Sequence, residues 1–262
     1  MFQNSSNITP AEQTEIARPT RRKWWMVIAI PAWVFVSFFT AQVITGGIVW
    51  LLVQLHVPLA SLNQAVLNAT LAALLYVITL VLVIGLPWLV KKHRTTRQDI
   101  GLTRLPSWMD ILVTPAGLIV YLIVSSLLIL LATNVLPGFD ISQPQETGFD
   151  QLGLRYEYVL AFLTLVVIAP VAEEILFRGY LYGKLKKFVP VWLAIMATSI
   201  LFGLVHGAWN LAIDTFALSV VLCLLREITG SIWAPILLHM TKNGIAFYLL
   251  FINPTLFTTL GG

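Results

Sequence analysis

Residues 160–178 read LAFLTLVVIAPVAEEILFR, and this stretch decides the fold of the chain. It is apolar over a length that fits a membrane span, yet it holds two adjacent carboxylates, Glu173 and Glu174, and ends at Arg178. A carboxylate near the centre of a bilayer costs roughly 2.5–3.5 kcal/mol. Two such groups in one span therefore predict a membrane protein in which the carboxylates are paired or used in a reaction.

The composition of the whole chain agrees with a membrane protein. Of its 262 residues, 58% are hydrophobic and 11% are charged, against roughly 25% charged residues in soluble domains. Mean hydropathy is +0.86. The predicted fold class is all-α, a polytopic bundle of about seven to eight transmembrane helices. The net charge of +4 does not indicate nucleic-acid binding, because the basic residues cluster between apolar runs and report topology instead.

Apolar runs of spanning length divide the chain into a single transmembrane domain with short polar ends. The runs fall at 25–54, 62–90, 109–136, 157–183, 190–208, 210–226 and 231–252. We expect a polar cytoplasmic segment at 1–24, the transmembrane domain at 25–252 and a short tail at 253–262. The first run is too long for the core of a cleaved signal peptide, so we expect it to be retained as a span.

The basic residues predict the orientation in the cell membrane. The cluster Arg21–Lys23, the loop 91–97 and the turn Lys184–Lys187 fall on one side of the predicted bundle, whereas the acidic loop 137–156 falls on the other. Because loops rich in Lys and Arg stay on the cytoplasmic side, we expect a cytoplasmic N-terminus.

Helical geometry separates the roles of the two glutamates. Glu174 and Arg178 are four residues apart, so they share one helix face and can pair. Glu173 points about 100° away from that face and is available to another partner. It lies about 16–20 Å along the helix from the basic turn Lys184–Lys187, which is deep in the membrane. We therefore expect a structural Glu174–Arg178 pair and a functional Glu173.

Two downstream apolar runs each carry a histidine with a second polar or aromatic residue four positions away. Phe202 and His206 share one helix face, as do His239 and Asn243. His239 lies about 12–15 Å from its membrane boundary and His206 about 24 Å from its own. The two imidazoles reach a common depth only if the helix with His206 tilts, if it is a half-helix, or if the predicted boundary of its run is wrong. Carboxylates and imidazoles that meet inside a membrane indicate water activation, metal binding or proton movement.

Taken together, these residues resemble a known family. Glu173-Glu174-x-x-x-Arg178, Phe202-x-x-x-His206 and His239-x-x-x-Asn243 are similar to the pattern of the type II CAAX prenyl endopeptidase and bacteriocin-processing family, also called the Abi family of intramembrane proteases. The resemblance covers about 160–250 and implies an endopeptidase with its catalytic core at 157–252. The spans before it match no pattern.

The resemblance also implies roles for the motif residues. Glu173 and His206 would activate the attacking water, and His239 and Asn243 would hold the oxyanion of the tetrahedral intermediate. Glu174 and Arg178 would support the site, together with Phe202. The implied substrate is a membrane-associated, prenylated or bacteriocin-type peptide or lipidated protein, which would enter from the cytoplasmic leaflet or from between helices.

Whether a metal takes part in the reaction stays open from the sequence. Glu173, His206 and His239 are a plausible ligand set for a divalent metal such as zinc, with Glu174 then free to act as the base. Against this, the sequence lacks His-Glu-x-x-His, in which two histidines on one helix preform the site. The family has been described both as metalloproteases and as glutamate proteases.

Rival functions of other classes use the same residue types. A proton-coupled transporter would need intramembrane Glu, His and Asp equally well, and a non-catalytic bacteriocin immunity protein would keep the fold without the reaction. Asp214 and Lys242 are the further intramembrane charges. We expect Asp214 to line a cavity or pair with a neighbour, and Lys242 to reach the membrane surface or face the cavity.

Overall fold

The computed structural model describes residues 24–92, 94–143, 147–149 and 152–259 of the chain, and all of its regular elements there are helices. The predicted all-α fold is therefore confirmed, whereas the predicted segment 1–24 lies almost entirely outside the described residues. The elements are α2 (Met26–Gln54), η1 (Leu59–Ser61), α3 (Gln64–Leu80), η2 (Val81–Gly85), α4 (Leu86–Lys91), α5 (Arg97–Ile100), α6 (Trp108–Val135), α7 (Arg155–Phe162), η3 (Leu163–Ile168), α8 (Ala169–Glu174), η4 (Ile175–Tyr182), α9 (Gly183–Leu185), α10 (Val191–Leu204), α11 (Trp209–Thr229), α12 (Trp233–Phe247), η5 (Tyr248–Ile252) and α13 (Pro254–Thr259).

Each of the seven predicted apolar runs holds helix. Among the described residues, five helices are long and apolar enough to cross a membrane by themselves: Met26–Gln54, Gln64–Val90, Trp108–Val135, Arg155–Leu185 and Trp233–Ile252. The predicted run 190–208 is shorter in the structure, because α10 ends at Leu204.

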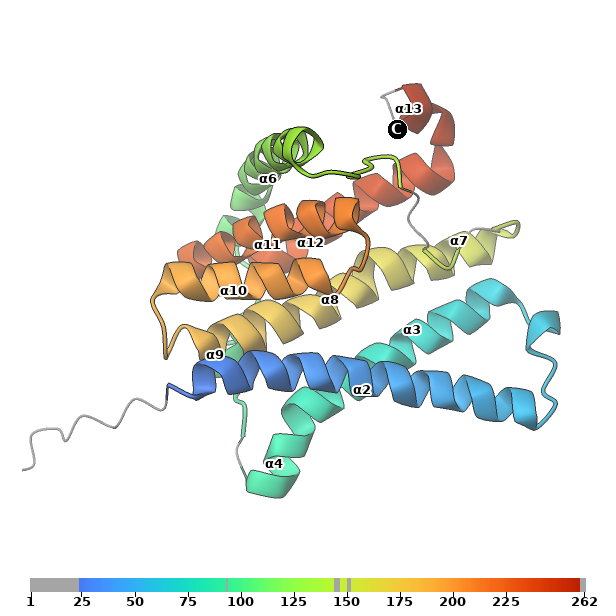
Figure 1. The fold of residues 1–262 in the computed structure, drawn as a ribbon, viewed down its shortest axis with the longest axis horizontal. Coiled ribbons are helices and arrows are strands. Elements are labelled where there is room, and N and C mark those ends of the chain that lie inside the picture. Colours follow the sequence, from blue (N-terminus) through green and yellow to red (C-terminus); the bar gives the residue numbers. More distant parts are fainter. Residues whose placement is uncertain (1–23, 93, 144–146, 150–151, 260–262) are drawn as a thin grey trace, which may run out of the picture.

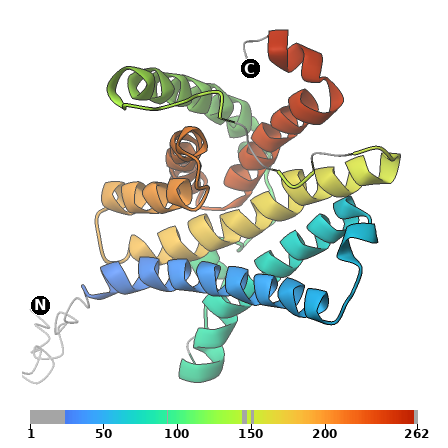
Figure 2. The ribbon, with the colours of Figure 1, turned by 45° about the vertical axis from the view of Figure 1, so that its right-hand side comes forward.

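The long helix Arg155–Leu185 lies at the centre of the bundle (Figure 1). In both ribbon views it runs between α2 and α3 on one side and α10 to α12 on the other (Figure 2). Two stretches of π-helix, η3 and η4, flank α8 within it. A π-helical turn changes the register of the side chains that follow and is frequent at functional sites. The central helix thereby carries Glu173 and Glu174 to the interior.

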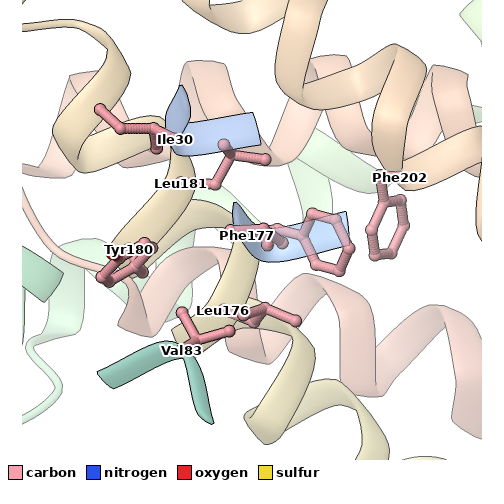
Figure 3. Packing of buried hydrophobic residues seen from close by; sticks show 8 residues of the cluster. Ile30, Val83, Leu176, Phe177, Tyr180, Leu181 and Phe202 are labelled. Atoms are coloured by element: carbon pink, nitrogen blue, oxygen red, sulfur yellow. The ribbon is translucent and has the colours of Figure 1, made fainter. Parts of the chain in front are cut away.

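One buried apolar core is formed by side chains of α2, η2, η4 and α10. Figure 3 shows Phe177 of η4 facing Phe202 of α10, with Leu176 and Val83 beside them. The rings of Phe177 and Phe202 meet edge to face at 4.8 Å between centroids. Such aromatic pairs contribute about 0.5–1.5 kcal/mol beyond the area they bury. This packing fixes α10 against the central helix.

Helices α10 and α11 approach closely at Gly203. A Cβ at this position would lie 2.7 Å from the carbonyl oxygen of Ala212, which is too close for any side chain. Glycine therefore permits the tight crossing of the two helices. The chain then turns between them through Gly207, whose φ of +79° is the left-handed conformation that glycine adopts freely.

A short segment around α5 ties one end of the bundle together. Thr96 caps α5 by accepting a hydrogen bond from the backbone N–H of Asp99, and Asp99 in turn pairs with Lys187 at 2.7 Å. The backbone N–H of Ile232 and the hydroxyl of Ser231 both donate to the carbonyl oxygen of Gly101. The segment therefore holds the end of the central helix next to the start of α12.

The charge of Asp99 makes the stability of the fold depend on pH. The hydrogen bond from Lys187 and those from Thr96 hold the pKa of Asp99 well below its usual range. A carboxyl whose pKa is lower in the folded state stabilises the fold above about pH 4, and loses this contribution as the pH falls. We expect Asp99→Asn to lower the free energy of unfolding at pH 7, and its deficit relative to the wild type to shrink progressively below about pH 4.

Unfolding of the wild type and Asp99→Asn in mixed detergent micelles, at pH 7 and again below about pH 4, measures this effect. Lys187→Met removes the same pair from the other side and should give a loss of the same sign at neutral pH. A deficit of Asp99→Asn that is equal at pH 7 and in acid would contradict the linkage.

Candidate active site

Glu174 and Arg178 form the buried base of the site. The Arg178 Nη1 and Glu174 Oε1 atoms are 2.8 Å apart, and both side chains are fully buried. The pair predicted from the four-residue spacing is therefore present. The guanidinium of Arg178 also lies over the ring of Phe202, 4.3 Å from its centroid, in cation–π geometry. One arginine thus connects the central helix to α10.

His239 of α12 bridges the two glutamates. Its Nδ1–H donates to Glu174 Oε1 at 2.8 Å, and its Nε2 lies 3.8 Å from Glu173 Oε2. The imidazole is buried. Because Nδ1 is held by Glu174, the second nitrogen of the ring is directed to the side of Glu173.

His206 lies in the turn that follows α10, beyond the helix end. Its Nδ1–H donates to the carbonyl oxygen of Phe202 at 2.6 Å, which leaves Nε2 as the acceptor nitrogen of the neutral ring. The Phe202 ring lies 4.8 Å from the His206 ring and 5.9 Å from the His239 ring. His206 also interacts electrostatically with Glu173 and His239. Because α10 ends before His206, this imidazole is placed by the turn, and it lies with the imidazole of His239 against the Phe202 ring.

Asn243 is the second motif residue of α12. Its side-chain amide donates to the carbonyl oxygen of Leu165 at 2.9 Å. Leu165 belongs to the π-helical stretch η3, and a π-helical turn displaces backbone hydrogen bonds from their usual partners. Asn243 therefore fastens α12 to the central helix one turn of α12 beyond His239.

Sequence reasoning missed Tyr76 of α3. The Tyr76 hydroxyl donates to Glu173 Oε1 at 2.6 Å, so the partner of Glu173 comes from a span for which the sequence showed no pattern. A tyrosine in the middle of an apolar run was the available signal, since a buried phenol needs a hydrogen-bond partner. Glu173 keeps 15% of its side chain exposed, whereas Glu174 beneath it has none.

Sequence reasoning left the partners of Asp214 and Lys242 open, and the structure pairs the two residues. Lys242 Nζ lies 3.2 Å from Asp214 Oδ2. The hydroxyls of Tyr121 and Ser125, both on α6, donate to Asp214 Oδ1. These four side chains lie on α6, α11 and α12 and connect the span α6 to the helix that carries His239.

The predicted metal ligands do not form a preorganised centre. In the part of the chain that the structure describes, no group of three or more His, Cys, Asp or Glu side chains is arranged to hold a metal ion. The Nδ1 atoms of His206 and His239 already have protein partners, and Glu173 accepts a hydrogen bond from Tyr76. Such Nδ1 bonds would leave Nε2 of each histidine available to a metal, but the three predicted ligands are not gathered into one group in the described part of the chain, so no catalytic step is assigned to a metal.

Comparisons with known proteins agree with the motifs. Residues 155–245 match the family described as "Type II CAAX prenyl endopeptidase Rce1-like". The chain is 28% identical over 94 residues to "Membrane-embedded CAAX protease MroQ" of Staphylococcus aureus (strain USA300), which covers 34% of this chain and 38% of that protein. It is 27% identical over 105 residues to the protein named "Putative membrane peptidase YdiL" of Bacillus subtilis (strain 168), covering 40% and 43%.

These matches span less than half the length of either relative. No solved structure matches the chain. The matched segment holds all seven residues that the motifs singled out, whereas Tyr76, Tyr121 and Ser125 lie before it. The resemblance predicted from the three motifs is therefore confirmed over residues 155–245, the part of this chain that matches the Rce1-like type II CAAX prenyl endopeptidases.

Proposed function

We propose that this chain is an intramembrane endopeptidase that hydrolyses a peptide bond of a membrane-associated peptide or protein. One observation carries the proposal. Glu173 is a partly exposed carboxylate inside a membrane-spanning helix, held by the Tyr76 hydroxyl and facing His239, above a fully buried Glu174–Arg178 pair. An intramembrane carboxylate that keeps access to the outside of the protein is a functional group by default.

Glu173 and His206 activate the attacking water in this proposal. His206 Nδ1–H is engaged with Phe202, so its Nε2 lone pair and the Glu173 carboxylate are the two proton acceptors that the site offers. The Glu173 carboxylate takes a proton from the water, and the resulting hydroxide adds to the carbonyl carbon of the substrate. The C–N bond then breaks, and the proton passes from the base to the leaving amine.

His239 and Asn243 hold the oxyanion of the tetrahedral intermediate. The Asn243 amide has a second N–H besides the one that it gives to Leu165. His239 donates from Nε2 only as an imidazolium, because Nδ1–H is already given to Glu174. Glu174 and Glu173 lie on either side of the ring, so that an imidazolium there is balanced by two carboxylates. Preorganised donors of this kind are strong in a site with little water.

The chemistry of the surroundings supports a substrate with an apolar part. A cavity of about 340 Å³ lies between α6, α10 and α11 and is lined almost wholly by apolar side chains. Gly203 and Leu204 in its wall belong to α10, the helix that carries Phe202, and lie on a different face of it from Phe202. A lipidated or strongly apolar peptide, such as the prenylated or bacteriocin-type substrates implied by the family, would place its hydrocarbon there.

The test of this proposal does not require the substrate to be identified beforehand. Membranes from cells that carry the wild type or Glu173→Ala at matched abundance are compared for free peptide termini. Termini present only with the wild type support the proposal and identify the substrate. Identical termini, with the variant correctly inserted, count against proteolysis and lead to assays of proton-coupled transport and of bacteriocin immunity.

Tyr76→Phe should lower the turnover number about tenfold and leave the fold intact. The substitution removes one hydrogen bond to a charged acceptor, Glu173 Oε1, which contributes about 1.5–3 kcal/mol. Cleavage of a quenched peptide that copies an identified cleavage site measures it. Tyr248→Phe, at an exposed tyrosine of η5, is the matched control and should cleave at the wild-type rate. Equal turnover numbers for the two variants would show that the Tyr76 hydroxyl does not contribute to the reaction.

A further inference from the structure

Lys242 is a charge inside the bundle that the mechanism above leaves without a role. It lies on α12 between His239 and Asn243, directly before Asn243 in the chain. Its ammonium interacts electrostatically with His206. It keeps 18% of its side chain exposed, much as Glu173 keeps 15%. Lys242 is therefore accessible, unlike the fully buried Glu174–Arg178 pair, and as the third residue after His239 it lies on the same side of α12.

Asp214 fixes the ammonium in place. Its Oδ2 lies 3.2 Å from Lys242 Nζ, and its Oδ1 accepts hydrogen bonds from Tyr121 at 2.7 Å and Ser125 at 2.6 Å. Both hydroxyls come from α6. A lysine has a flexible side chain, and holding it in one position costs conformational entropy. The Asp214 carboxylate, which is itself held by two hydroxyls, restricts the lysine before any substrate binds and so lowers that cost.

The donors around the site favour a role for this ammonium. The amide of Asn243 already donates to Leu165, and His239 already donates to Glu174. His206 donates to Phe202 and offers an acceptor nitrogen. An ammonium has three N–H donors, and among the described residues Asp214 is the one carboxylate within ion-pair distance of it. Besides the second N–H of Asn243, Lys242 thus offers donors that carry a positive charge.

We propose that Lys242 is a further catalytic residue, whose ammonium donates a hydrogen bond to the oxyanion of the tetrahedral intermediate. Asp214, Tyr121 and Ser125 are its positioning residues. The inference rests on the proposed endopeptidase function and adds one group to it. When the water oxygen bonds to the carbonyl carbon, the electron pair of the C=O bond moves to the carbonyl oxygen. The Lys242 ammonium then stabilises the negative charge on that oxygen. Lys242 keeps its proton throughout the reaction.

This role differs from a purely structural ion pair in a measurable way. Removing a donor that acts in the transition state lowers kcat and leaves KM nearly unchanged, whereas removing a group that binds the ground state raises KM. A structural pair, once broken, lowers stability, and activity follows stability. The separation of kcat, KM and unfolding therefore decides between the three roles.

The experiment uses the full chain in detergent micelles and a quenched peptide that copies a cleavage site found in the comparison of termini. We expect Lys242→Met to lower kcat about 10²–10³-fold with KM changed less than about threefold, as for the loss of an oxyanion donor. Lys242→Arg keeps the charge and should recover at least about tenfold of that loss. Lys186→Met, the same substitution at the partly exposed pair with Glu227, should leave both constants unchanged.

A kcat of Lys242→Met within about threefold of the wild type, or a rise in KM at unchanged kcat, would overturn the inference. So would a loss of kcat that Lys242→Arg does not restore. If Lys242→Met fails to fold, Tyr121→Phe supplies the readout, because it loosens Asp214 without leaving a charge unpaired. It should lower kcat several-fold at constant KM, and an unchanged kcat would overturn the inference.

The failure of this inference is distinct from the failure of the proposed function. If Glu173→Gln is inactive while Lys242→Met cleaves normally, the protein is a protease and Lys242 is not catalytic. If the wild type releases no termini that Glu173→Gln lacks, the proposed function falls, and the role of Lys242 falls with it.

Discussion

Glu173→Gln should reduce peptide cleavage by about three orders of magnitude or more, because the variant has no carboxylate to take the proton of the attacking water. The amide keeps the volume of the side chain and can still accept the hydrogen bond of Tyr76, which the structure places at Glu173 Oε1. Folding and insertion should therefore be nearly unchanged. Turnover of the quenched peptide and the comparison of termini both measure the loss.

A matched Glu→Gln substitution controls for the loss of a negative charge. Glu227→Gln removes a partly exposed carboxylate that pairs with Lys186 at an end of the bundle, and it should cleave at the wild-type rate. If Glu173→Gln retained more than about a tenth of the wild-type kcat, Glu173 would not be the general base. His206 or another group would then have to supply that function.

Arg178→Met should produce the largest loss of stability, about 3 kcal/mol in the free energy of unfolding. Breaking a buried ion pair from one side costs about 3–5 kcal/mol, because it leaves an uncompensated charge. We expect the lower end of this range, since Glu174 still accepts the hydrogen bond of His239. The loss of the cation over Phe202 adds a smaller contribution. Unfolding in mixed micelles measures it.

The partly exposed Lys186–Glu227 pair is the matched control for this stability effect. Lys186→Met should cost no more than about 1 kcal/mol, as surface pairs do. Glu174→Gln combined with Arg178→Met should cost less than the sum of the single variants, because the second substitution removes the partner that the first leaves unpaired. Equal losses for Arg178→Met and Lys186→Met would show that burial of the pair contributes nothing.

Local spacing within single helices accounts for the part of the site that the sequence predicted. Glu174 and Arg178 pair because residues four apart on a helix are neighbours, and this holds whatever the rest of the chain does. Of the residues that the three motifs named, Arg178, His206 and His239 lie around Phe202 in the structure. The mismatch in depth of the two histidines left a tilt, a half-helix and a wrong boundary open, and in the structure α10 ends at Leu204, before His206.

Residue spacing along the chain could not predict which side chains of different helices contact one another. Nothing in the sequence tied Tyr76 to Glu173, Asn243 to Leu165 or His239 to Glu174, because each contact depends on how two distant helices cross. Crossing angles follow from the packing of side-chain ridges and from close approaches such as that at Gly203. The orientation of the chain in the membrane and its substrate stay predictions.

Hydrophobicity and charge along the chain, which are local properties, determined that this protein is a helical membrane protein with an intramembrane carboxylate pair. An unpaired backbone polar group and an unpaired side-chain charge are both costly in lipid, and this cost leaves few structures other than a helical bundle with paired or reactive carboxylates. The tertiary structure alone decided which glutamate stays accessible, which nitrogen of each histidine is engaged, and that Asp214 and Lys242 meet. Those choices depend on distances between helices, and distances between helices are set by packing of the whole bundle.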